Sequence, residues 1–583
     1  MKSDLAGLTD AFARGFRLGD RVIEPTLRSI VRPDGELRVE PRVMEVLLAL
    51  ARRAGDTVSR DELIEAVWKH PHVTDEALSR CISLLRQALG DDRAQPRFVE
   101  TIPKRGYRLM VPAAFDVPPL TVTQSVISLA VLPFLNLSGD PAEEHLADGI
   151  TELLIANLAC MSSLRVISRT SAMHFKGSRA RLTEIARELD VSRVVEGSVL
   201  RSGTQLQVVV QLIDPATDMH LFARTYTRAL SDVLRLQNEI AWKVAEEIGT
   251  TLKPLERERL PRARALNEDA MQAYLRARHF WAQRTPDGFQ RAIREYETCI
   301  AIEPEFAPAF AGLADTLMIM GLYGVTAPAS LSARARELAD RALVLDGDSA
   351  EALSARGGVA LFFEWNIDAA QTLLRRALEV NSSHDVARLC LADALMFRGD
   401  FDAGMRELQQ AVSVNPLDLG LQMNVGDFLF WMRRYGEAVT QLQHTLELGP
   451  HFWPARCLLA ESFAMLGDAA SAKQQFERAS HDVPPARLVR SKAFVHATLG
   501  EREPALALLR ELEAARALRY VPPTEIARGY AALGDADQAF RWIDLGIEER
   551  TPRMLMLGIS VGYDRIKDDP RFSDRLTRIG IPG

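Results

Sequence analysis

The hydrophobic pattern of residues 74–110 predicts an amphipathic helix followed by a β-hairpin. Within Thr74–Leu89, four large apolar side chains recur at helical spacing, so they share one face that must be buried in a core. These side chains are Leu78, Ile82, Leu85 and Leu89. Gly90 ends the helix, and the segments Arg97–Thr101 and Tyr107–Met110 then alternate as two short strands.

Shorter patterns precede this helix. Phe16–Val39 alternates between polar and apolar residues around two turns, which predicts a small N-terminal sheet. Pro41 then begins a helix, and Ser59 caps a second one that carries acidic residues in its first turn.

The middle of the chain predicts an α/β layer domain. Val126–Phe134 is a continuous apolar run typical of a buried strand. The predicted order is strand, helix, strand, helix, three strands and a closing helix. The helices are expected at Ala142–Cys160, Leu182–Leu189 and near Val233–Leu252, and the further strands at Leu164–Ile167, Arg193–Leu200, Gln205–Ile213 and Met219–Tyr226.

The remainder of the chain repeats. Pro416, Pro450 and Pro484 are 34 residues apart. Small residues, which a close approach of two helices requires, recur in phase at Ala392, Gly426 and Ala460. A 34-residue period is that of the tetratricopeptide repeat, in which each unit is a pair of antiparallel helices. Weaker units on both sides extend the array to seven or eight, enough for a self-supporting solenoid.

Charge is distributed unevenly along the chain. The net charge is −7, yet residues 1–112 carry 19 Lys and Arg against 17 Asp and Glu, whereas the rest carries 52 against 61. A weakly positive N-terminal part on an acidic remainder favours nucleic-acid contact by the N-terminal part alone.

The cysteines and the hydropathy pattern predict a soluble cytoplasmic protein with no membrane contact. Cys81, Cys160, Cys299, Cys390 and Cys457 are scattered and form no C-x-x-C pair, which favours reduced thiols. The sequence has no run of 18 or more apolar residues and no signal-peptide pattern.

The polar face of the predicted helix and the basic hairpin suit contact with DNA. A major groove admits a helix, and hydroxyl, amide and guanidinium groups donate to phosphates or base edges there. The candidate DNA-binding residues of the helix are Ser79, Arg80, Ser83, Arg86 and Gln87. Those of the hairpin are Arg97, Thr101, Lys104, Arg105 and Arg108. On pattern alone, a surface helix and hairpin with solvated charges are the more common explanation.

Three long motifs resemble the OmpR-type winged helix in its CadC/ToxR-like subgroup. The motifs are Leu63-Ile64-Glu65-Ala66-Val67-Trp68, the segment Val73–Asp91, and Thr101-Ile102-Pro103-Lys104-Arg105-Gly106-Tyr107-Arg108. The resemblance implies that the helix enters the major groove and that the hairpin touches the adjacent minor groove. Leu84 stands where many members carry a base-contacting arginine, so no base preference is implied.

The same resemblance bears on the loop between the second helix and the reading helix. It implies that Lys69, His70 and His72 contact RNA polymerase. A turn constrained by Pro71 explains the loop equally well.

The middle domain has a resemblance of its own. Val131–Phe134, Leu146–Ile150 and Val195–Val199 are similar to segments of the TolB-amino-terminal-like domain, which occurs in bacterial regulators and in some cyclase-associated proteins. This resemblance implies a fold and no particular ligand.

One catalytic pattern occurs, G-x-S-x-G at Gly558-Ile559-Ser560-Val561-Gly562, but it lies beyond the last repeat without the strand-to-helix context and is interpreted as a chance match. The sequence contains no G-x-x-x-x-G-K-[ST], no H-E-x-x-H and no G-x-G-x-x-G. Asp140, Glu143, Glu144 and Asp148 lie close together, but Asp140 before Pro141 is better explained as a helix-capping turn than as a metal ligand. We therefore predict no enzyme, no metal and no cofactor.

The predicted fold class is a multidomain α+β and all-α chain. Its parts are an N-terminal winged helix-turn-helix at 14–112, a linker at 113–125, a TolB-like α/β domain at 126–254, a tetratricopeptide repeat α-solenoid at 266–552 and a C-terminal cap at 553–583. The predicted function is sequence-specific regulation of transcription. Its partners are promoter DNA, RNA polymerase, and a protein or small-molecule effector at the solenoid, with a dimer on DNA as one arrangement.

Two alternatives stay open. One is an interaction scaffold whose winged helix is a protein contact. The other is a nucleotide-binding or cyclase-related role for the central domain.

Overall fold

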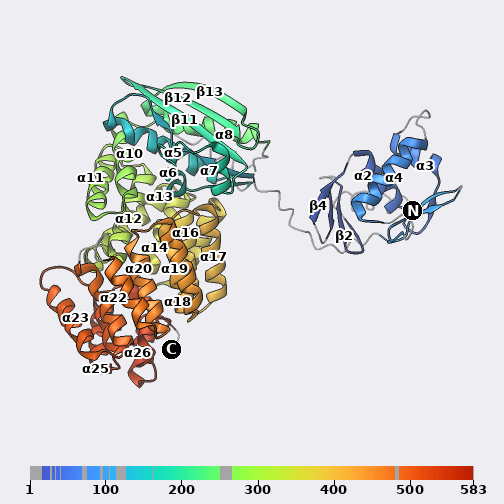
Figure 1. The fold of residues 1–583 in the computed structure, drawn as a ribbon. Helices are drawn as coiled ribbons and strands as arrows, with labels where there is room; N and C mark the ends of the chain where they lie inside the picture. The colour runs from blue at the N-terminus through green and yellow to red at the C-terminus, as the bar shows by residue number, and fades with distance from the viewer. Residues whose placement is uncertain are drawn as a thin grey trace. The chain divides into compact units, whose positions relative to one another are not determined.

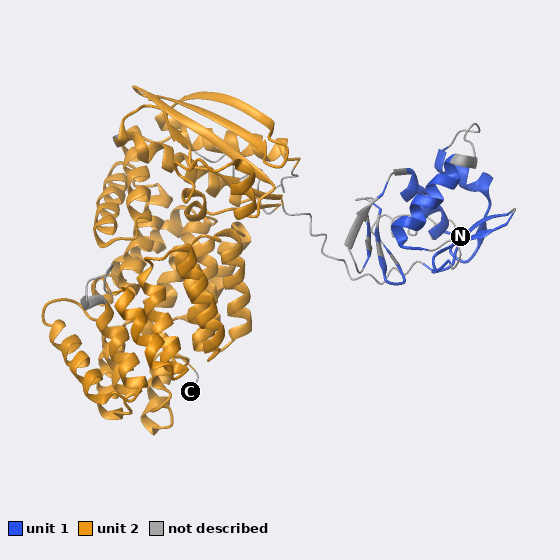
Figure 2. Cartoon of the chain, in the orientation of Figure 1, with its two compact units in different colours: residues 1–125 blue, residues 126–583 orange. Residues whose placement is uncertain are grey.

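A computed structural model describes residues 16–25, 29–32, 35–39, 41–68, 75–91, 96–103, 105–112, 127–161, 163–249, 265–479 and 485–581. The chain divides into two compact units, Met1–Ser125 and Val126–Gly583 (Figure 2). We call them the N-terminal unit and the body. The predicted fold class is confirmed, because a winged-helix unit is followed by a sheet region and a long array of paired helices.

In its described residues, the N-terminal unit combines two small sheets with three helices. The first sheet is antiparallel and contains β1 (Phe16–Leu18), β2 (Arg21–Glu24), β3 (Ser29–Arg32) and β4 (Gly35–Arg38). The helices are α2 (Pro41–Ala51), α3 (Arg60–Trp68) and α4 (Asp75–Leu89). The second sheet has the order β5-β7-β6 and consists of β5 (Thr57–Val58), β6 (Val99–Ile102) and β7 (Gly106–Leu109). Helix α4 and the hairpin β6–β7 therefore form where the sequence predicts them.

Local signals in the sequence set the ends of these helices. The Ser59 hydroxyl accepts the Glu62 N–H at 3.2 Å, and a Glu62 carboxylate oxygen accepts the Ser59 N–H at 2.8 Å, which is a capping box. At the end of α4, Arg21 Nε donates to the Leu89 carbonyl at 3.0 Å. The first sheet thus satisfies a carbonyl that the helix end leaves open.

The apolar face of α4 lies in the core of the N-terminal unit. Leu78, Ile82, Leu85 and Leu89 are at most 2% exposed and share one cluster with Phe98 of the hairpin segment. The buried face predicted for this helix is confirmed.

The body opens with an α/β domain whose sheet has the order β10-β8-β11-β12-β13 (Figure 1). β8 pairs in parallel with β10 and β11, whereas β11, β12 and β13 form an antiparallel meander. The strands are β8 (Ile127–Val131), β9 (Leu135–Asn136), β10 (Leu164–Val166), β11 (Arg193–Ser202), β12 (Gln205–Asp214) and β13 (Met219–Ala229). The helices are α5 (Glu144–Ala159), α6 (Arg169–Met173), α7 (Leu182–Glu188) and α8 (Val233–Glu247).

Paired helices make up the rest of the body. They are α10 (Glu268–Ala282), α11 (Pro286–Ile302), α12 (Ala307–Leu322), α13 (Ser332–Leu345), α14 (Ala350–Phe362), α15 (Ile367–Val380), α16 (Asp385–Phe397), α17 (Phe401–Val414), α18 (Leu419–Trp431), α19 (Tyr435–Leu448), α20 (Trp453–Met465), α21 (Ala469–Ala479), α22 (Pro485–Thr498), α23 (Arg502–Ala515), α24 (Pro523–Ala532) and α25 (Ala536–Glu548). Small residues let the partners approach: a Cβ on Gly426 of α18 would lie 2.7 Å from Leu442 of α19. These pairs form the predicted repeat solenoid.

The α/β domain packs against the repeats at two places. Helix α5 lies against α10, and one apolar cluster runs from Leu129 of the sheet through both helices into the repeats. Farther along the solenoid, the Ser171 hydroxyl donates to Asn415 Oδ1 at 2.6 Å, and the Ser168 N–H donates to the Val414 carbonyl at 2.7 Å. The α/β domain and the solenoid therefore form one continuous body.

The last segment of the chain returns to the early repeats. It contains η5 (Pro552–Met556), η6 (Val561–Tyr563) and α26 (Pro570–Arg578). Just before η5, the Arg550 guanidinium lies 4.8 Å from the centre of the Trp365 ring. Arg433 of an earlier repeat pairs with Asp564 at 2.7 Å. The C-terminal segment thus contacts residues of earlier repeats.

Within the described part of the chain, no helix has both the length and the apolar character that crossing a bilayer requires.

Candidate nucleic-acid interface

Helix α4 presents a polar strip opposite its buried face. Ser79, Ser83 and Gln87 follow one another at four-residue spacing and are exposed, and Arg80 beside them is exposed as well. These four residues were predicted to contact DNA, and the fold leaves each of them accessible. Leu84, at the border of the strip, packs half-buried against the core.

Arg86 is placed differently from the prediction. It is only 8% exposed, and its guanidinium turns toward the hairpin. Its Nη2 donates to the Val99 carbonyl and to Thr101 Oγ1, both at 2.8 Å, and Nε donates to the Val99 carbonyl at 3.2 Å. DNA contact by Arg86 and Thr101 stays a prediction, but in the folded unit their polar groups bind each other and hold strand β6 against α4.

Asp91 is a positioning residue that the sequence patterns did not single out. Its carboxylate accepts three backbone N–H groups, from Arg97 at 2.5 Å, Phe98 at 3.1 Å and Val99 at 2.7 Å. It thereby fixes the start of β6 directly after the end of α4. An acidic residue after the helix-ending Gly90 was the available signal, but its targets lie beyond a loop and could not be identified from spacing.

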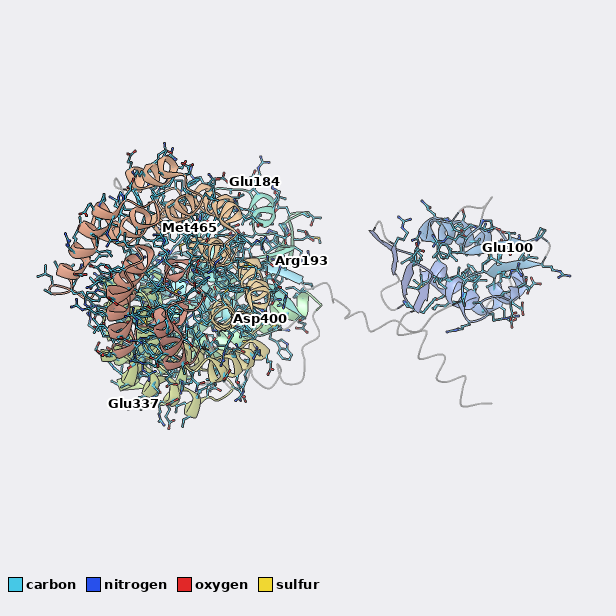
Figure 3. The ribbon with its side chains drawn as sticks, turned by 90° about the horizontal axis from the view of Figure 1, so that it is seen from below. Glu100, Glu184, Arg193, Glu337, Asp400 and Met465 are labelled. Atoms are coloured by element: carbon cyan, nitrogen blue, oxygen red, sulfur yellow. The ribbon has the colours of Figure 1, made fainter. Side chains whose placement is uncertain are left out.

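Two of the predicted hairpin cations have acidic partners within the unit. Arg97 pairs with Asp20 at 2.7 Å, and Arg108 pairs with Glu100 at 2.6 Å. Figure 3 labels Glu100, which lies on β6. These ion pairs are half-exposed, and each holds its arginine beside a carboxylate of the same unit.

Arg105 at the tip is exposed, and among the described residues no ion pair engages its side chain. Lys104 lies outside the described residues, as do Lys69, His70 and His72 of the predicted polymerase loop. Arg105 is therefore the tip cation that the structure presents for a phosphate contact.

Removing the Arg86 guanidinium should loosen the hairpin. In Arg86→Met the apolar stem stays in place, but the Val99 carbonyl and Thr101 Oγ1 lose their donor. We expect a destabilisation of about 2–3 kcal/mol, because buried acceptors are left without a partner. Faster hydrogen exchange of the β6 and β7 amides in the full chain would report it. Arg80→Met on the exposed strip is the control, with an expected change within about 0.5 kcal/mol; equal effects of the two variants would refute the positioning role.

The acidic residues considered for a metal site have other partners. Glu143 pairs with Arg201 at 3.2 Å, and Glu144 pairs with Lys176 at 2.7 Å. Asp148 also pairs with Lys176. Across the residues that the structure describes, no three His, Cys, Asp or Glu side chains are arranged to hold a metal ion.

Asp148 belongs to an ionic network where α5 meets the first repeat. Burial works against its charge, but the His279 hydrogen bond at 3.3 Å and Lys176 hold the pKa of Asp148 below its usual value. One turn along α5, Glu152 is 7% exposed and accepts from Arg278 of α10, with Nε at 3.1 Å. The network joins the α/β domain to the solenoid.

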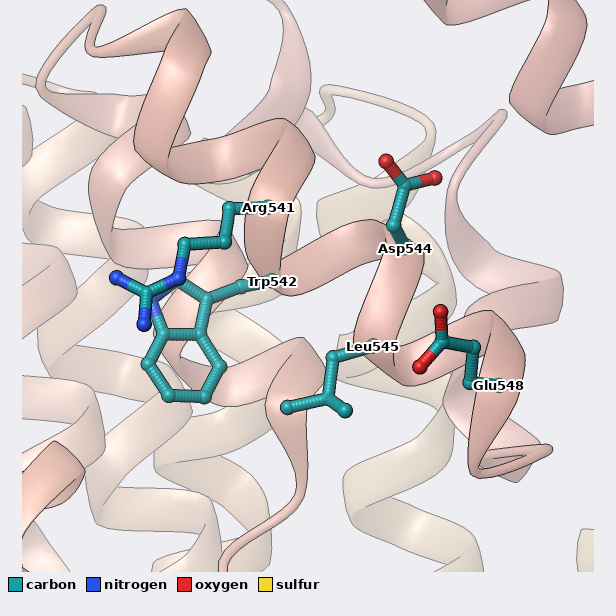
Figure 4. A pocket seen from close by; sticks show the side chains of 5 residues that line it. All are labelled: Arg541, Trp542, Asp544, Leu545 and Glu548. Carbon is teal, nitrogen blue, oxygen red and sulfur yellow. The ribbon is translucent and has the colours of Figure 1, made fainter.

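A shallow pocket of about 300 Å³ lies on helix α25 (Figure 4). Its lining residues are Arg541, Trp542, Asp544, Leu545 and Glu548. Arg541 lies over the Trp542 ring, 5.6 Å from its centre, and Asp544 accepts hydrogen bonds from Arg575 and Arg578. Of the charged lining residues, Asp544 joins α25 to α26 through these arginines.

Comparison with known proteins identifies the N-terminal unit. Residues 34–109 match the family described as "Transcriptional regulatory protein, C terminal". The matched segment runs from β4 through α4 to the end of β7, so it contains the exposed strip of α4 and the hairpin described above.

Three relatives show how far the likeness extends. The chain is 26% identical over 332 residues to the transcriptional regulator HilA of Salmonella typhimurium, covering 56% of this chain and 58% of HilA. It is 42% identical over 97 residues to the transcriptional activator CadC of Escherichia coli (strain K12), covering 16% and 19%. It is 36% identical over 186 residues to a protein of Rhizobium meliloti (strain 1021) provisionally named adenylate cyclase 3, covering 32% of each chain. In each case the chain spans less than two thirds of the relative's length.

Proposed function

We propose that this chain, whose N-terminal unit is an OmpR-type winged-helix DNA-binding domain, regulates transcription by binding promoter DNA. The observation that carries the proposal is the exposed strip of α4 beside a hairpin that Arg86 and Asp91 hold in place. Sequence-selective DNA binding requires a helix that contacts bases in the major groove and a second contact held in a fixed position relative to that helix. Binding to DNA would place the protein in the bacterial cytoplasm, with RNA polymerase as a partner through the loop that contains Lys69, His70 and His72.

The roles of the individual residues can be separated by measurement. Arg80→Ala should lower affinity by about 1–3 kcal/mol at its preferred base and relax the sequence preference at that position.

Arg105→Ala should weaken all sequences nearly equally and reduce the slope of log affinity against log salt by about 1, because a tip cation contacts phosphate. The DNA is chosen by mapping the genomic fragments that the protein binds. The affinities for these fragments are then measured by titration with the full chain at several salt concentrations. Absence of salt-dependent binding on every mapped fragment would favour the scaffold alternative.

The body is the part of the chain that we propose to bind the regulatory effector. Its repeats are paired helices of the kind that bind partner proteins, and the α/β domain is built into the same body through α5 and α10. An effector that binds either part can therefore act on the whole body. The activity we propose involves no catalysis.

A cyclase-related role is the second candidate, and the likeness to the Rhizobium protein favours it. The two candidates differ in what they require. A regulator needs the strip of α4, whereas a cyclase-related role of the body would persist in Arg80→Ala.

A further inference from the structure

The sheet of the α/β domain has two edges of very different character. At one edge, β10 is three residues long, and Arg165 within it donates to the Ser413 carbonyl of the repeats at 2.8 Å. At the other edge, β13 is eleven residues long and pairs with β12 alone among the described residues. Figure 1 shows β13 at the outer margin of the body. Natural proteins shorten, charge or cover such edges, because free backbone groups pair with another strand.

Strand β13 is neither short nor covered among the described residues. Seven of its eleven residues are exposed, and its protections are limited to Arg224, Arg228 and one register shift opposite Leu212 and Ile213. Threonine, tyrosine, phenylalanine and leucine, which favour strands, occupy most of its central positions. The edge is therefore suited to take up a further strand.

The hydrogen-bond pattern shows which residues of β13 face outward. The Leu230 N–H donates to the Thr204 carbonyl at the β12–β13 side of the sheet. In an antiparallel ladder, the backbone groups of alternate residues point to the same side, so the even-numbered residues from Phe222 to Arg228, which lie on one side of the register shift in this ladder, face β12. The N–H and C=O groups of Ala223, Thr225 and Thr227 consequently point to the free edge.

We propose that β13 pairs antiparallel with β13 of a second copy of this chain, with Thr225 opposite Thr225 on the two-fold axis. A two-fold axis makes the contact self-complementary, and an antiparallel pair of identical strands satisfies that symmetry. In this register Ala223 of one copy bonds with Thr227 of the other. The two sheets become one continuous sheet across the dimer.

Like-charge repulsion disfavours two neighbouring registers. Around Thr225, Arg224 lies opposite Tyr226 and Arg228 lies opposite Phe222, so neither arginine lies opposite another positive charge. Centring on Tyr226 would place Arg224 opposite Arg228, and centring on Arg224 would place it opposite itself. Both of those registers juxtapose like charges.

Helix α8 on the covered face of the sheet is compatible with this approach. Arg228 forms an ion pair with Glu239 of α8 at 3.1 Å. The Arg224 guanidinium lies 5.6 Å from the centre of the Phe222 ring on the same strand. The arginines are thus held along the sheet instead of projecting across the edge.

A disulfide distinguishes this register from any other contact. Directly opposite residues of a hydrogen-bonded antiparallel pair are about 5.5 Å apart at Cα, within the range of a disulfide. Thr225→Cys should therefore cross-link two full-length chains under mild oxidation. Thr227→Cys, on the same exposed face, is the matched control: two Thr227 residues would be separated by about 13 Å. Four native cysteines are buried and Cys160 is half-buried, so the unsubstituted chain sets the background.

Charged variants test the same contact without oxidation. Light scattering of the full chain at micromolar concentration should give the mass of a dimer. Thr225→Lys and Thr225→Glu should each raise the dimer dissociation constant at least tenfold, and an equimolar mixture of the two should restore the dimer. The exposed Gln207→Lys on β12, one strand inward, should leave it unchanged. A monomeric full chain, a dimer that Thr225→Lys leaves intact, or equal cross-linking at 225 and 227 would each overturn the proposal. These readouts use no DNA, so they stand or fall independently of the proposed function.

Discussion

Gly106→Ala is expected to unfold the hairpin of the N-terminal unit and abolish its DNA binding. Gly106 begins β7 with φ +146°, and a Cβ there would lie 2.0 Å from the Val58 carbonyl oxygen of β5. The obstacle is backbone of a paired strand, so it cannot rotate away, and β5–β7 pairing must break. We expect a loss of about 4 kcal/mol or more, a large fraction of the stability of a small domain.

The measurement is denaturant unfolding of the N-terminal unit, followed by hydrogen exchange at β5 and β7 in the full chain. Gly55→Ala is the matched control, because Gly55 also has a positive φ, +90°, but nothing lies within 4 Å of the added Cβ. It should cost only about 1–2 kcal/mol, from backbone strain alone. Similar losses in the two variants would show that the contact with Val58 does not matter.

The sequence predicted the position of α4 and its buried face because both follow from local rules. The helical spacing of Leu78, Ile82 and Leu85 defines one face, and Gly90 marks the end. Periodicity gives the direction of a side chain but not what packs above it. By its position in the helical pattern, Arg86 lies near the polar strip. The hairpin covers it in the fold, because its guanidinium binds Val99 and Thr101, which lie 13 and 15 residues later in the chain. Its burial could not be read from the helix pattern.

The same limit applies to the hairpin charges. Arg97 is paired with Asp20, which lies 77 residues earlier in the chain, and no local pattern connects them. Glu100 and Arg108 are eight residues apart, and their pairing follows only once the strand register is fixed. A count of basic residues therefore overstated the charge that this hairpin has free for phosphate.

In the body, the 34-residue period predicted paired helices because each pair repeats the same local packing. It did not predict how the array meets the α/β domain. Asn381 and Asn415 occupy equivalent positions, yet Asn381 accepts a local N–H from Ser383, whereas Asn415 binds Ser171 of the α/β domain. Equivalent positions acquire different contacts because the superhelix brings only one of them to the other domain.

Arg278→Met is expected to weaken the contact between the α/β domain and the first repeat. Glu152 would remain buried beside α10 with only Arg169, 3.4 Å away, to compensate its charge. Loss of one partner of a buried ion pair typically costs about 3–5 kcal/mol. Arg276→Met, two residues earlier on α10, removes an ion pair with Glu295 inside the repeat and is the matched control. That pair is about one-third exposed, so we expect a cost of at most about 1 kcal/mol.

Acidification should reproduce the effect of Arg278→Met in the unsubstituted chain. Burial opposes the charge of Glu152, but attraction to Arg278 and Arg169 holds the pKa of this carboxyl below its ordinary value. A lowered pKa in the folded state means that the stabilisation is complete above the pKa of an unfolded glutamate, about 4.3, and is lost as pH falls through the folded value. The protection of α5 and α10 amides, measured relative to the intrinsic exchange rate at each pH, should therefore fall below about pH 4.5 in the unsubstituted chain. In Arg278→Met the exchange should already be fast at neutral pH, with a weaker dependence on acid. If Arg276→Met and Arg278→Met instead exchange alike at every pH, the Glu152–Arg278 pair does not hold the two parts of the body together.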